Sequence, residues 1–564
     1  MAHALLWIES LVALLLLAST LLSAIVKASS RLWRPRLWQL LLGLLFAIPL
    51  VAVPVGLTVV AGVLRFSQRT PGVPFIPLGV WASLSIIGTS VLLVRGLRIR
   101  SEDRQPRAMS WPLGRLSAYT LVAAALTCLT YNSLENDVRV RMTQLRLEAG
   151  ARALAISPAR ILDRDNAAPI YQEAGATSGQ FSKGRQLETI WSNDLRKLDL
   201  TEQKLIEFIN SSQPVLRLLR RGASMPAARF DWDSSDPHQL LPEVQFLREG
   251  AEVLILDAML RAHKGDSAGA AADLSAVFAI ANQLDGPYLI VVLVAAAIET
   301  RGIEALEAAL ANAKSSQEDL AKIKLVRNAT YRTKLLRSLR HESQTIAPAL
   351  FAHIALAGYD LDRTWNLKGG QYFSNHAFQS FWRVFLFDDD LASSVRRWER
   401  MRALAALPYC DVREEWGRFD LDHNDELGVL TRILAKLFQG LTRANAAAVA
   451  ASADARHELA VIGLAAKRYQ IAKGSFPEKL ENLVPDYVDH VPADPFGNGP
   501  MHMKRDGNDL VLYSVGADCR DDGGAPWDDL KKQGDIVFRV HGDRIRHEGR
   551  GAQRRPQRND FAGP

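Results

Sequence analysis

The three cysteines are the residues whose chemistry depends most on their surroundings in this chain. Cys128 falls inside an apolar run and is expected to be inert there. Cys410 and Cys519 could form a disulfide if their part of the chain lies outside the cytoplasm, in an oxidising compartment. Their spacing gives no geometry for such a bond, so the pairing stays open. No cysteine spacing typical of a metal site is present in the sequence.

An acidic segment from Asp420 to Glu426 has the spacing of the first positions of a calcium-binding helix-loop-helix. It departs from that motif at two positions. Asp425 stands where the sharp turn needs glycine, and Thr431 stands where a bidentate glutamate is needed. We therefore expect a solvated acidic loop that caps a helix from about Glu426.

Local signatures of catalysis are missing from the soluble part of the sequence. It contains no nucleophile elbow, phosphate-binding glycine loop, dinucleotide fingerprint or zinc-protease motif. Catalytic triads assemble in space and need no local signature, so a hydrolase site inside the helical region stays open as an alternative.

The length and the charge distribution of the chain indicate how it is divided into parts. A chain of 564 residues exceeds the usual size of one hydrophobic core, so we expect a membrane part and at least two soluble parts. The net charge of +7 comes from 68 basic and 61 acidic residues. Much of the excess lies beside apolar runs and in the Arg-rich tail after Gly549, which favours a role in membrane topology over nucleic-acid binding.

Four apolar runs have the length that a bilayer requires. A transmembrane helix needs roughly 20 residues to cross about 30 Å of hydrocarbon. The runs that meet this length extend from Leu5 to Val26, Trp38 to Leu64, Phe75 to Val94 and Leu116 to Leu134. The sequence therefore predicts a four-helix transmembrane anchor.

The loops between these runs predict the orientation of the anchor. The first and third loops are rich in Lys and Arg, whereas the second has only Arg65 and Arg69. Because basic loops stay in the cytoplasm, the N-terminus and everything after Leu134 should lie outside it, as in a bacterial inner-membrane protein. Glu9 could belong to a transport path, but it lies near the chain start and can reach the interface, so an anchor is favoured over a transporter.

The middle of the chain has the periodicity of amphipathic helices. The Ala-rich segments on either side of Gly265-Asp266 resemble a tetratricopeptide hairpin. Only one such hairpin is found, so an irregular helical bundle is favoured over a repeat array. An aromatic group around Trp382 is typical of a core rather than a ligand platform. The expected helices are Glu243 to His263, Ser267 to Leu284, Tyr288 to Leu310, Ser316 to Leu339, His341 to Leu356, Asn375 to Phe387 and Leu391 to Leu407.

The C-terminal region has a different pattern, with punctuation by Gly, Pro and Asp. A long helix from about Leu437 to Ala472 should end at Gly474, and a short helix should follow from Glu478 to Leu483. Alternating apolar residues then predict a small antiparallel sheet. Its strands are expected at Met501 to Lys504, Asp509 to Ser514 and Gly534 to Val540, the last in a hairpin with Arg544 to Arg546.

An ordered series of motifs in this region resembles the soluble domain of the G-type major pseudopilins of type II secretion. It covers about 90 residues and consists of Gly474-Ser-Phe-Pro477, Leu483-Val-Pro485, Val491-Pro-Ala-Asp494-Pro-Phe-Gly497, Leu512-Tyr-Ser514-Val-Gly-Ala-Asp518 and Gly534-Asp535-Ile536. Pseudopilins begin with a short leader and an apolar helix, whereas four predicted spans precede the module here. The resemblance therefore implies the fold and its extracytoplasmic setting rather than assembly into a pilus.

The same resemblance implies a calcium site. In that family, acidic side chains and backbone carbonyls of the loop after the Tyr-Ser strand hold the ion, and the matching residues are Asp518 and Asp535. Asp521 and Asp522 are further donors in the loop. Hard oxygen ligands suit calcium, although these carboxylates could also stay hydrated, and residues 525–533 make the loop longer than in the family.

Together these patterns predict a mainly α protein with four parts. They are a transmembrane region (1–134), an α-helical extracytoplasmic domain (135–436), a pseudopilin-like α+β module (437–548) and a disordered basic tail (549–564). We expect a non-enzymatic scaffold that contacts the lipid bilayer and envelope or secretion-related proteins, and no nucleic acid. An extracytoplasmic hydrolase and, third, a transporter are the alternatives.

Overall fold

The computed structural model describes most of the chain after residue 135. The described residues are 136–152, 161–177, 195, 199–232, 241–312, 316–357, 382–421, 431, 446–497, 499–528 and 530–542. The four predicted spans, Cys128, most of the Asp420 to Glu426 segment and the C-terminal tail lie outside these ranges. Within the described ranges, no helix is long and apolar enough to cross a membrane.

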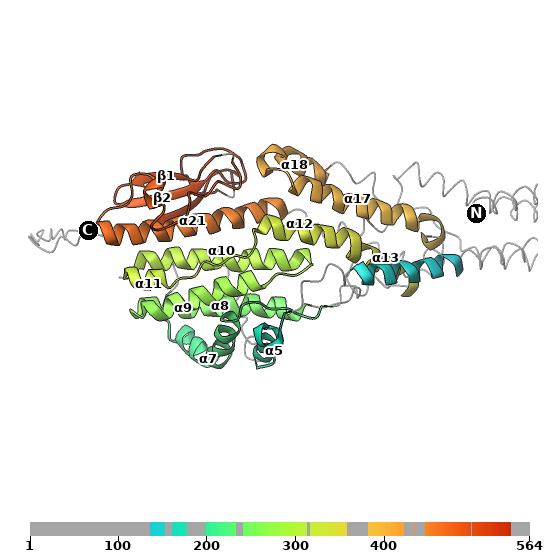
Figure 1. Ribbon diagram of the computed structural model, residues 1–564, viewed down its shortest axis with the longest axis horizontal. Helices are drawn as coiled ribbons and strands as arrows, with labels where there is room; N and C mark the ends of the chain where they lie inside the picture. The colour runs from blue at the N-terminus through green and yellow to red at the C-terminus, as the bar shows by residue number, and fades with distance from the viewer. Residues whose placement is uncertain are drawn as a thin grey trace, which may run out of the picture.

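The helices are stacked in layers beneath the small sheet (Figure 1). From the sheet downward, α21 (Ala446–Lys473) covers α10 (Leu289–Asn312), and α10 covers the pair α8 (Pro242–His263) and α9 (Ser267–Gln283). The outermost layer contains α7 (Gln203–Ala223) and α5 (Ala168–Thr177). Helices α8 and α9 form the predicted hairpin, in which Gly265 has φ +84° and the Asp266 side chain accepts a hydrogen bond from the Gly269 N–H.

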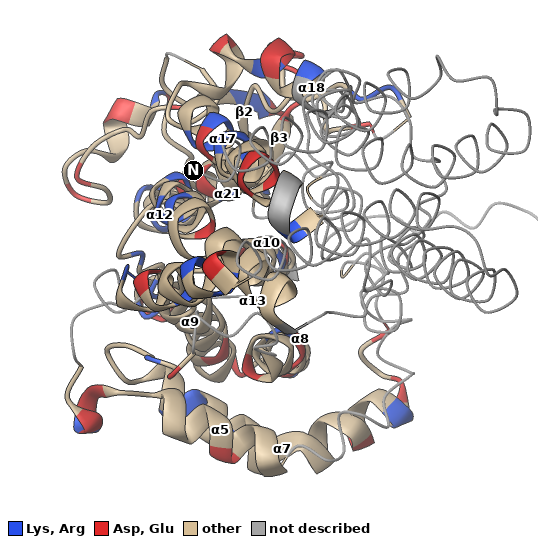
Figure 2. Cartoon of the chain, turned by 90° about the vertical axis from the view of Figure 1, so that its right-hand side faces the viewer, with Lys and Arg blue, Asp and Glu red and all other residues tan. Residues whose placement is uncertain are grey.

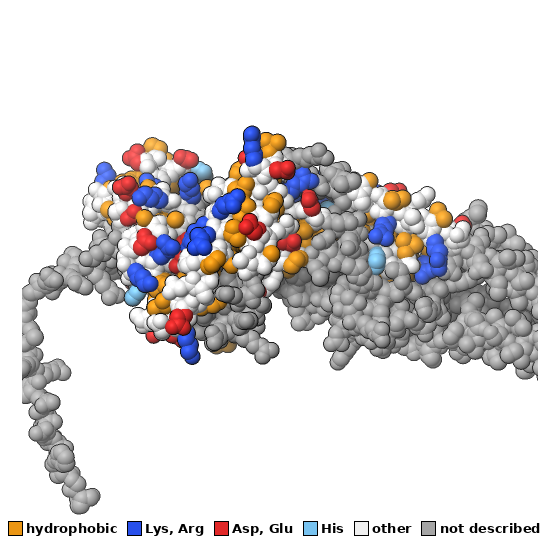
Figure 3. All heavy atoms as spheres, turned by 90° about the horizontal axis from the view of Figure 1, so that it is seen from below, with side chains coloured by type: hydrophobic (Ala, Val, Ile, Leu, Met, Phe, Trp, Pro, Cys, Tyr) orange, Lys and Arg blue, Asp and Glu red, His pale blue; other side chains and the backbone are white. Residues whose placement is uncertain are grey.

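Ion pairs join the outer layers. Arg220 of α7 donates from Nε to Oδ1 of Asp273 on α9 at 2.5 Å, and its Nη2 pairs with Asp257 on α8. Both aspartates are buried. Acidic and basic residues elsewhere are interspersed along the described helices (Figure 2), and the face in Figure 3 mixes charged and apolar side chains.

The expected single helix from Ser316 to Leu339 is wrong. The structure has a short α11 (Gln317–Ala321), a non-helical connection and then α12 (Tyr331–His341). Backbone N–H groups of this connection bond to side chains of α9. The Lys324 N–H donates to Ser275 Oγ, and the Asn328 N–H donates to Asn282 Oδ1. Ser316 is the N-cap residue of α11 and accepts from the Asp319 N–H.

Helix α12 continues through a π-helical turn, η4 (Glu342–Ile346), into α13 (Ala347–Ala357). A second π-helical turn, η5 (Trp382–Leu386), leads into α17 (Phe387–Ala405). Trp382, Phe351 and Phe387 form a buried ring cluster with centroids 5.4–6.2 Å apart, as expected for core residues. The turn η6 (Tyr409–Asp411) and α18 (Arg413–Leu421) follow.

The C-terminal region contains η8 (Leu480–Leu483), a 3₁₀ helix within the short helix expected from Glu478 to Leu483, and a three-stranded antiparallel sheet. The strands β1 (His502–Asp506), β2 (Asp509–Ser514) and β3 (Ile536–Val540) lie in that order, with Leu512 opposite both Met503 and Phe538. Phe538 reaches α21 at Gly463, where an added Cβ would lie 2.4 Å from the ring. The expected fold class, mainly helical with a small antiparallel sheet, is confirmed.

One continuous core joins the helices to the sheet. The cluster of buried apolar side chains extends from Ala167 to Val540. Helix α21 is buried on both sides, because it packs against α10 and α12 on one side and against β2 and β3 on the other. The module predicted at 437–548 therefore shares its longest helix with the core of the helical bundle.

Candidate functional site

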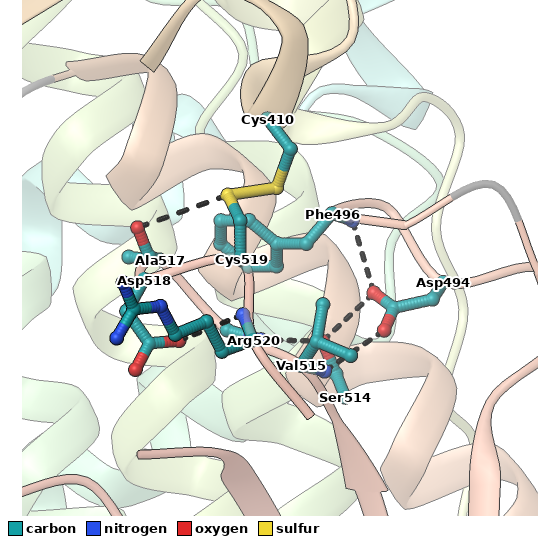
Figure 4. The surroundings of a disulfide bond; sticks show 10 residues. Cys410, Asp494, Phe496, Ser514, Val515, Ala517, Asp518, Cys519 and Arg520 are labelled. Atoms are coloured by element: carbon teal, nitrogen blue, oxygen red, sulfur yellow. Dashed lines mark hydrogen bonds between the residues drawn. A yellow bond between two sulfur atoms is a disulfide. The ribbon is translucent and has the colours of Figure 1, made fainter. Parts of the chain in front are cut away.

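Cys410 and Cys519, whose pairing the sequence left open, form a disulfide with their Cα atoms 5.7 Å apart. Cys410 belongs to η6, and Cys519 belongs to the loop that follows β2 (Figure 4). The bond spans 109 positions of sequence and ties the end of the α17 segment to the C-terminal module. Disulfides persist in oxidising compartments and are rare in the cytosol.

The predicted cation ligands Asp518 and Asp535 are both buried in the loop after β2, at 3% and 1% exposure. Their carboxylates accept hydrogen bonds from the backbone of the same loop. Asp518 Oδ2 accepts from the Gly534 N–H at 2.8 Å, and Asp535 Oδ2 accepts from the Gly524 N–H at 2.6 Å. Burial raises the pKa of Asp535, and these amide donors oppose that rise.

Asp521 and Asp522, the other predicted donors, lie on the exposed side of the loop. The described residues contain no group of three or more His, Cys, Asp or Glu side chains that could hold a metal ion. Backbone N–H groups face both buried carboxylates. The arrangement does not fit a calcium site, and calcium binding stays a prediction of the family resemblance.

Asp494 is a buried acid of this region that the sequence did not single out. Its Oδ1 accepts from Ser514 Oγ at 2.8 Å and from the Phe496 N–H at 2.9 Å, and its Oδ2 accepts from the Val515 N–H at 3.0 Å (Figure 4). These bonds fix the linker before the sheet to the end of β2.

A groove with a volume of about 530 Å³ opens where the module meets the helical bundle. That volume lies within the range typical of ligand pockets. Its floor is the first half of α21, and its walls are the start of α12, the segment from Ala405 to Tyr409, and the linker from His490 to Pro495. The floor is lined by small side chains, namely Ala447, Ala450 and Ala451.

Charged groups at one end of the groove pair with each other. Arg327 donates to Asp454 Oδ1 at 2.8 Å and to Glu458 Oε1 at 2.6 Å. Asp454 also accepts from the backbone N–H groups of Tyr331 and Arg332, so it caps α12 across the groove. Burial raises the pKa of Asp454, and Arg327 opposes this rise. Because Asp454 occupies the N-terminus of α12, the groove does not offer that terminus to an anion.

A buried polar cluster lies behind the groove. His457 Nδ1 contacts Glu299 Oε1, and the Tyr331 hydroxyl donates to Glu299 Oε2 at 2.6 Å. Burial acts to raise the pKa of Glu299, but its bonds to His457 and Tyr331 outweigh burial and leave that pKa below its usual range. Lys334, also buried, donates to the Asn282 carbonyl at 3.2 Å, and burial lowers its pKa.

The groove has little of the material that a hydrolase needs. Thr330 and Thr333 bond to each other at 2.8 Å, and the described lining contains no serine or cysteine. His490 is the one histidine in the lining. The His457–Glu299 pair is bonded to Tyr331 within the core, so nucleophile and base do not converge in the described lining.

No family model matches this chain, and neither the curated proteins nor the solved structures give a match.

The groove residues could not be found from the sequence, because Arg327, Asp454 and Glu458 look like ordinary polar positions of helices and loops. The available signal was Asp454 and His457 among the alanines of α21, but neither residue type by itself distinguishes a buried from a solvated position.

Proposed function

We propose that this protein is a membrane-anchored, extracytoplasmic interaction protein, and that its groove binds an extended segment of a partner protein. The groove at the junction of the bundle and the module carries this proposal. The Ala-rich floor gives room for one or two apolar side chains, and the exposed Thr333 and Ala493 lie at opposite walls. A volume of about 530 Å³ suits a short peptide segment better than a whole folded surface.

The placement outside the cytoplasm is supported by two independent observations. The disulfide between Cys410 and Cys519 is typical of an oxidising compartment. The basic loops between the predicted spans place the same residues outside the cytoplasm. A pseudopilin-like order of helix, linker and antiparallel sheet supports a role near secretion or envelope assembly.

Site-specific photo-crosslinking in cells tests the proposal. A photoreactive amino acid replaces Thr333 or Ala493 in the groove, and Arg337 on α12, outside the groove lining, serves as the control position. We expect the same envelope protein to crosslink from both groove positions and not from position 337. Crosslinking from all three positions, or from none, would contradict a groove-specific partner.

A further inference from the structure

The disulfide joins two segments that adjoin the groove, although neither cysteine lines it. Leu407 and Tyr409, which line one wall, directly precede Cys410. Cys519 lies on the loop after β2, and the other wall is tied to the end of β2 through Asp494. The disulfide therefore links the segment that continues from one wall to the loop that the Asp494 bonds tie to the other wall.

A ring contact joins the same two walls. Tyr409 meets Phe496 edge to face, with ring centroids 5.4 Å apart. Such a contact is reversible and can separate when its neighbours move, whereas the disulfide cannot. Arg332 also holds this wall by donating to the Ala405 and Ala406 carbonyls, so among these contacts the disulfide is the link that a reductant can remove.

The disulfide is placed where a reductant can reach it. Both cysteine residues are partly exposed. Cys519 has φ +61°, a left-handed conformation that is uncommon for residues with a side chain, in a turn closed by its N–H to the Gly516 carbonyl at 3.2 Å. Loss of the bond frees this turn to relax, which would shift the loop between Asp518 and Gly534.

The fold does not depend on the disulfide to place its layers. Helix α21 packs against α10, α12, β2 and β3 in one apolar core beneath the groove. The segment from Leu407 to Cys410 lies at the edge of that core, and Leu407 is 49% exposed. Release of the cross-link is therefore expected to move a wall rather than to unfold the protein.

We infer that the Cys410–Cys519 disulfide is a redox latch of the groove, which holds the Leu407–Tyr409 wall against the module until a dithiol reduces it. The inference rests on the proposed function only in taking the groove as the binding site. A thiolate of the dithiol attacks one sulfur and releases the other cysteine as a thiol, and the second thiol of the same reductant then breaks the mixed disulfide. The reductant loses two electrons and two protons, and both Cys410 and Cys519 become thiols.

Distance measurement across the groove tests the latch in the full-length protein in lipid nanodiscs. Spin labels are attached through ketone-bearing amino acids at Leu407 and Ala493, so that the native cysteines stay in place. A matched control pair at Lys264 and Lys322 reports on the helical layers, and both residues are exposed. Pulsed electron spin resonance is recorded before and after dithiothreitol, with free thiols counted in parallel.

We expect reduction to add two reactive thiols, to lengthen and broaden the 407–493 distance distribution, and to leave the 264–322 distribution unchanged. The double variant Cys410→Ser/Cys519→Ser should show the wide distribution without dithiothreitol. An unchanged 407–493 distribution after two thiols appear would overturn the latch, and so would the absence of a disulfide in the purified protein. If the double variant does not fold, reduction of the native protein still decides the question.

The test separates the latch from the proposed function, because no partner is present in the distance measurement. A shift in distance without groove-specific crosslinking would keep the latch and reject the partner groove. Groove-specific crosslinking without a shift would reject the latch alone.

Discussion

The carboxylate of Asp454 on α21 accepts a hydrogen bond from the backbone N–H of Tyr331 at 2.8 Å, and it thereby begins α12. The same carboxylate pairs with Arg327. Asp454 therefore joins α21, which the module shares with the bundle, to α12, which forms a wall of the groove. Thr330 is the N-cap residue of α12 and accepts from the Thr333 N–H, and Asp454 adds acceptors for the N–H groups of Tyr331 and Arg332.

Replacing Asp454 should be among the most damaging single changes near the groove. In Asp454→Ala, Arg327 loses one of its two carboxylates and two N–H groups of α12 lose their acceptor. We expect a loss of about 3–5 kcal/mol of unfolding free energy, as for other broken buried ion pairs. Thermal unfolding in detergent measures the loss, with Glu318→Gln on the exposed surface as a control within about 0.5 kcal/mol. Equal stability of the two variants would show that Asp454 does not hold α12.

The helices with clear periodicity could be predicted from the sequence. The prediction failed where hydrogen bonds between residues far apart in the sequence determine the structure. Helices α8 and α9 start or end within a residue of expectation, and β2 has the expected bounds. The break before α12 could not be predicted in full, because besides the local N-cap Thr330 it depends on Ser275 and Asn282 of α9 and on Asp454, which is more than 120 positions away. The pairing of Cys410 and Cys519 could not be predicted for the same reason, because a separation of 109 positions in the sequence does not indicate a distance in space.

The buried His341 and its half-buried neighbour Glu342 have titrations with opposite effects on stability. Both ring nitrogens of His341 lack a hydrogen-bond partner among the described residues, and burial lowers its pKa from 6.5 to about 4. Burial raises the pKa of Glu342 from 4.5 to about 7, although its carboxylate accepts from the Leu289 N–H at 3.1 Å, which opposes the rise. The folded protein thus keeps His341 neutral and Glu342 protonated across an overlapping range of pH.

Because His341 gains its proton more readily in the unfolded chain, its contribution to stability is present above pH 6.5 and is lost as the pH falls toward 4. Glu342 acts in the other direction, because the folded state keeps a proton that the unfolded chain releases, so stability falls as the pH rises from 4.5 to 7. The two slopes should nearly cancel in the native protein. Glu342→Gln should leave stability rising with pH from 4 to 6.5, and His341→Leu should leave it falling from 4.5 to 7. Parallel melting profiles for the two variants would refute this assignment.

Asp518 and Asp521 should differ in importance despite lying in the same acidic loop. Asp518→Asn weakens a buried bond to the Gly534 N–H, so we expect a loss of about 1–3 kcal/mol. Asp521 is exposed, and Asp521→Asn should change stability by less than about 0.5 kcal/mol.

Thermal melting of the native protein in calcium chloride and in a chelator completes the experiment. We expect equal melting temperatures with calcium and with the chelator, because N–H groups already face the buried carboxylates. A rise in melting temperature with calcium that Asp535→Asn abolishes would establish the family-type site instead.

The orientation of the chain can be tested with paired reporters. We expect alkaline phosphatase fused after Gly549 to be active and green fluorescent protein fused there to be dark, because the basic loops place this end outside the cytoplasm. The same reporters fused after Arg104, in the third predicted loop, should give the reverse result. A fluorescent fusion after Gly549 would overturn both the orientation and the compartment in which the disulfide is expected to persist.

Gly463 and Gly417 offer a matched pair of helix glycines with opposite expected effects. Alanine at an exposed helix position stabilises by up to about 1 kcal/mol over glycine, and Gly417 on α18 has no atom within 4 Å of an added Cβ. Gly463→Ala should instead destabilise by about 1–3 kcal/mol, because the new Cβ would overlap the Phe538 ring and push β3 from α21. Phe538→Leu in the Gly463→Ala background should recover part of that loss by giving the methyl group space. Stabilisation by both alanine variants would show that α21 and β3 do not pack as closely as this contact requires.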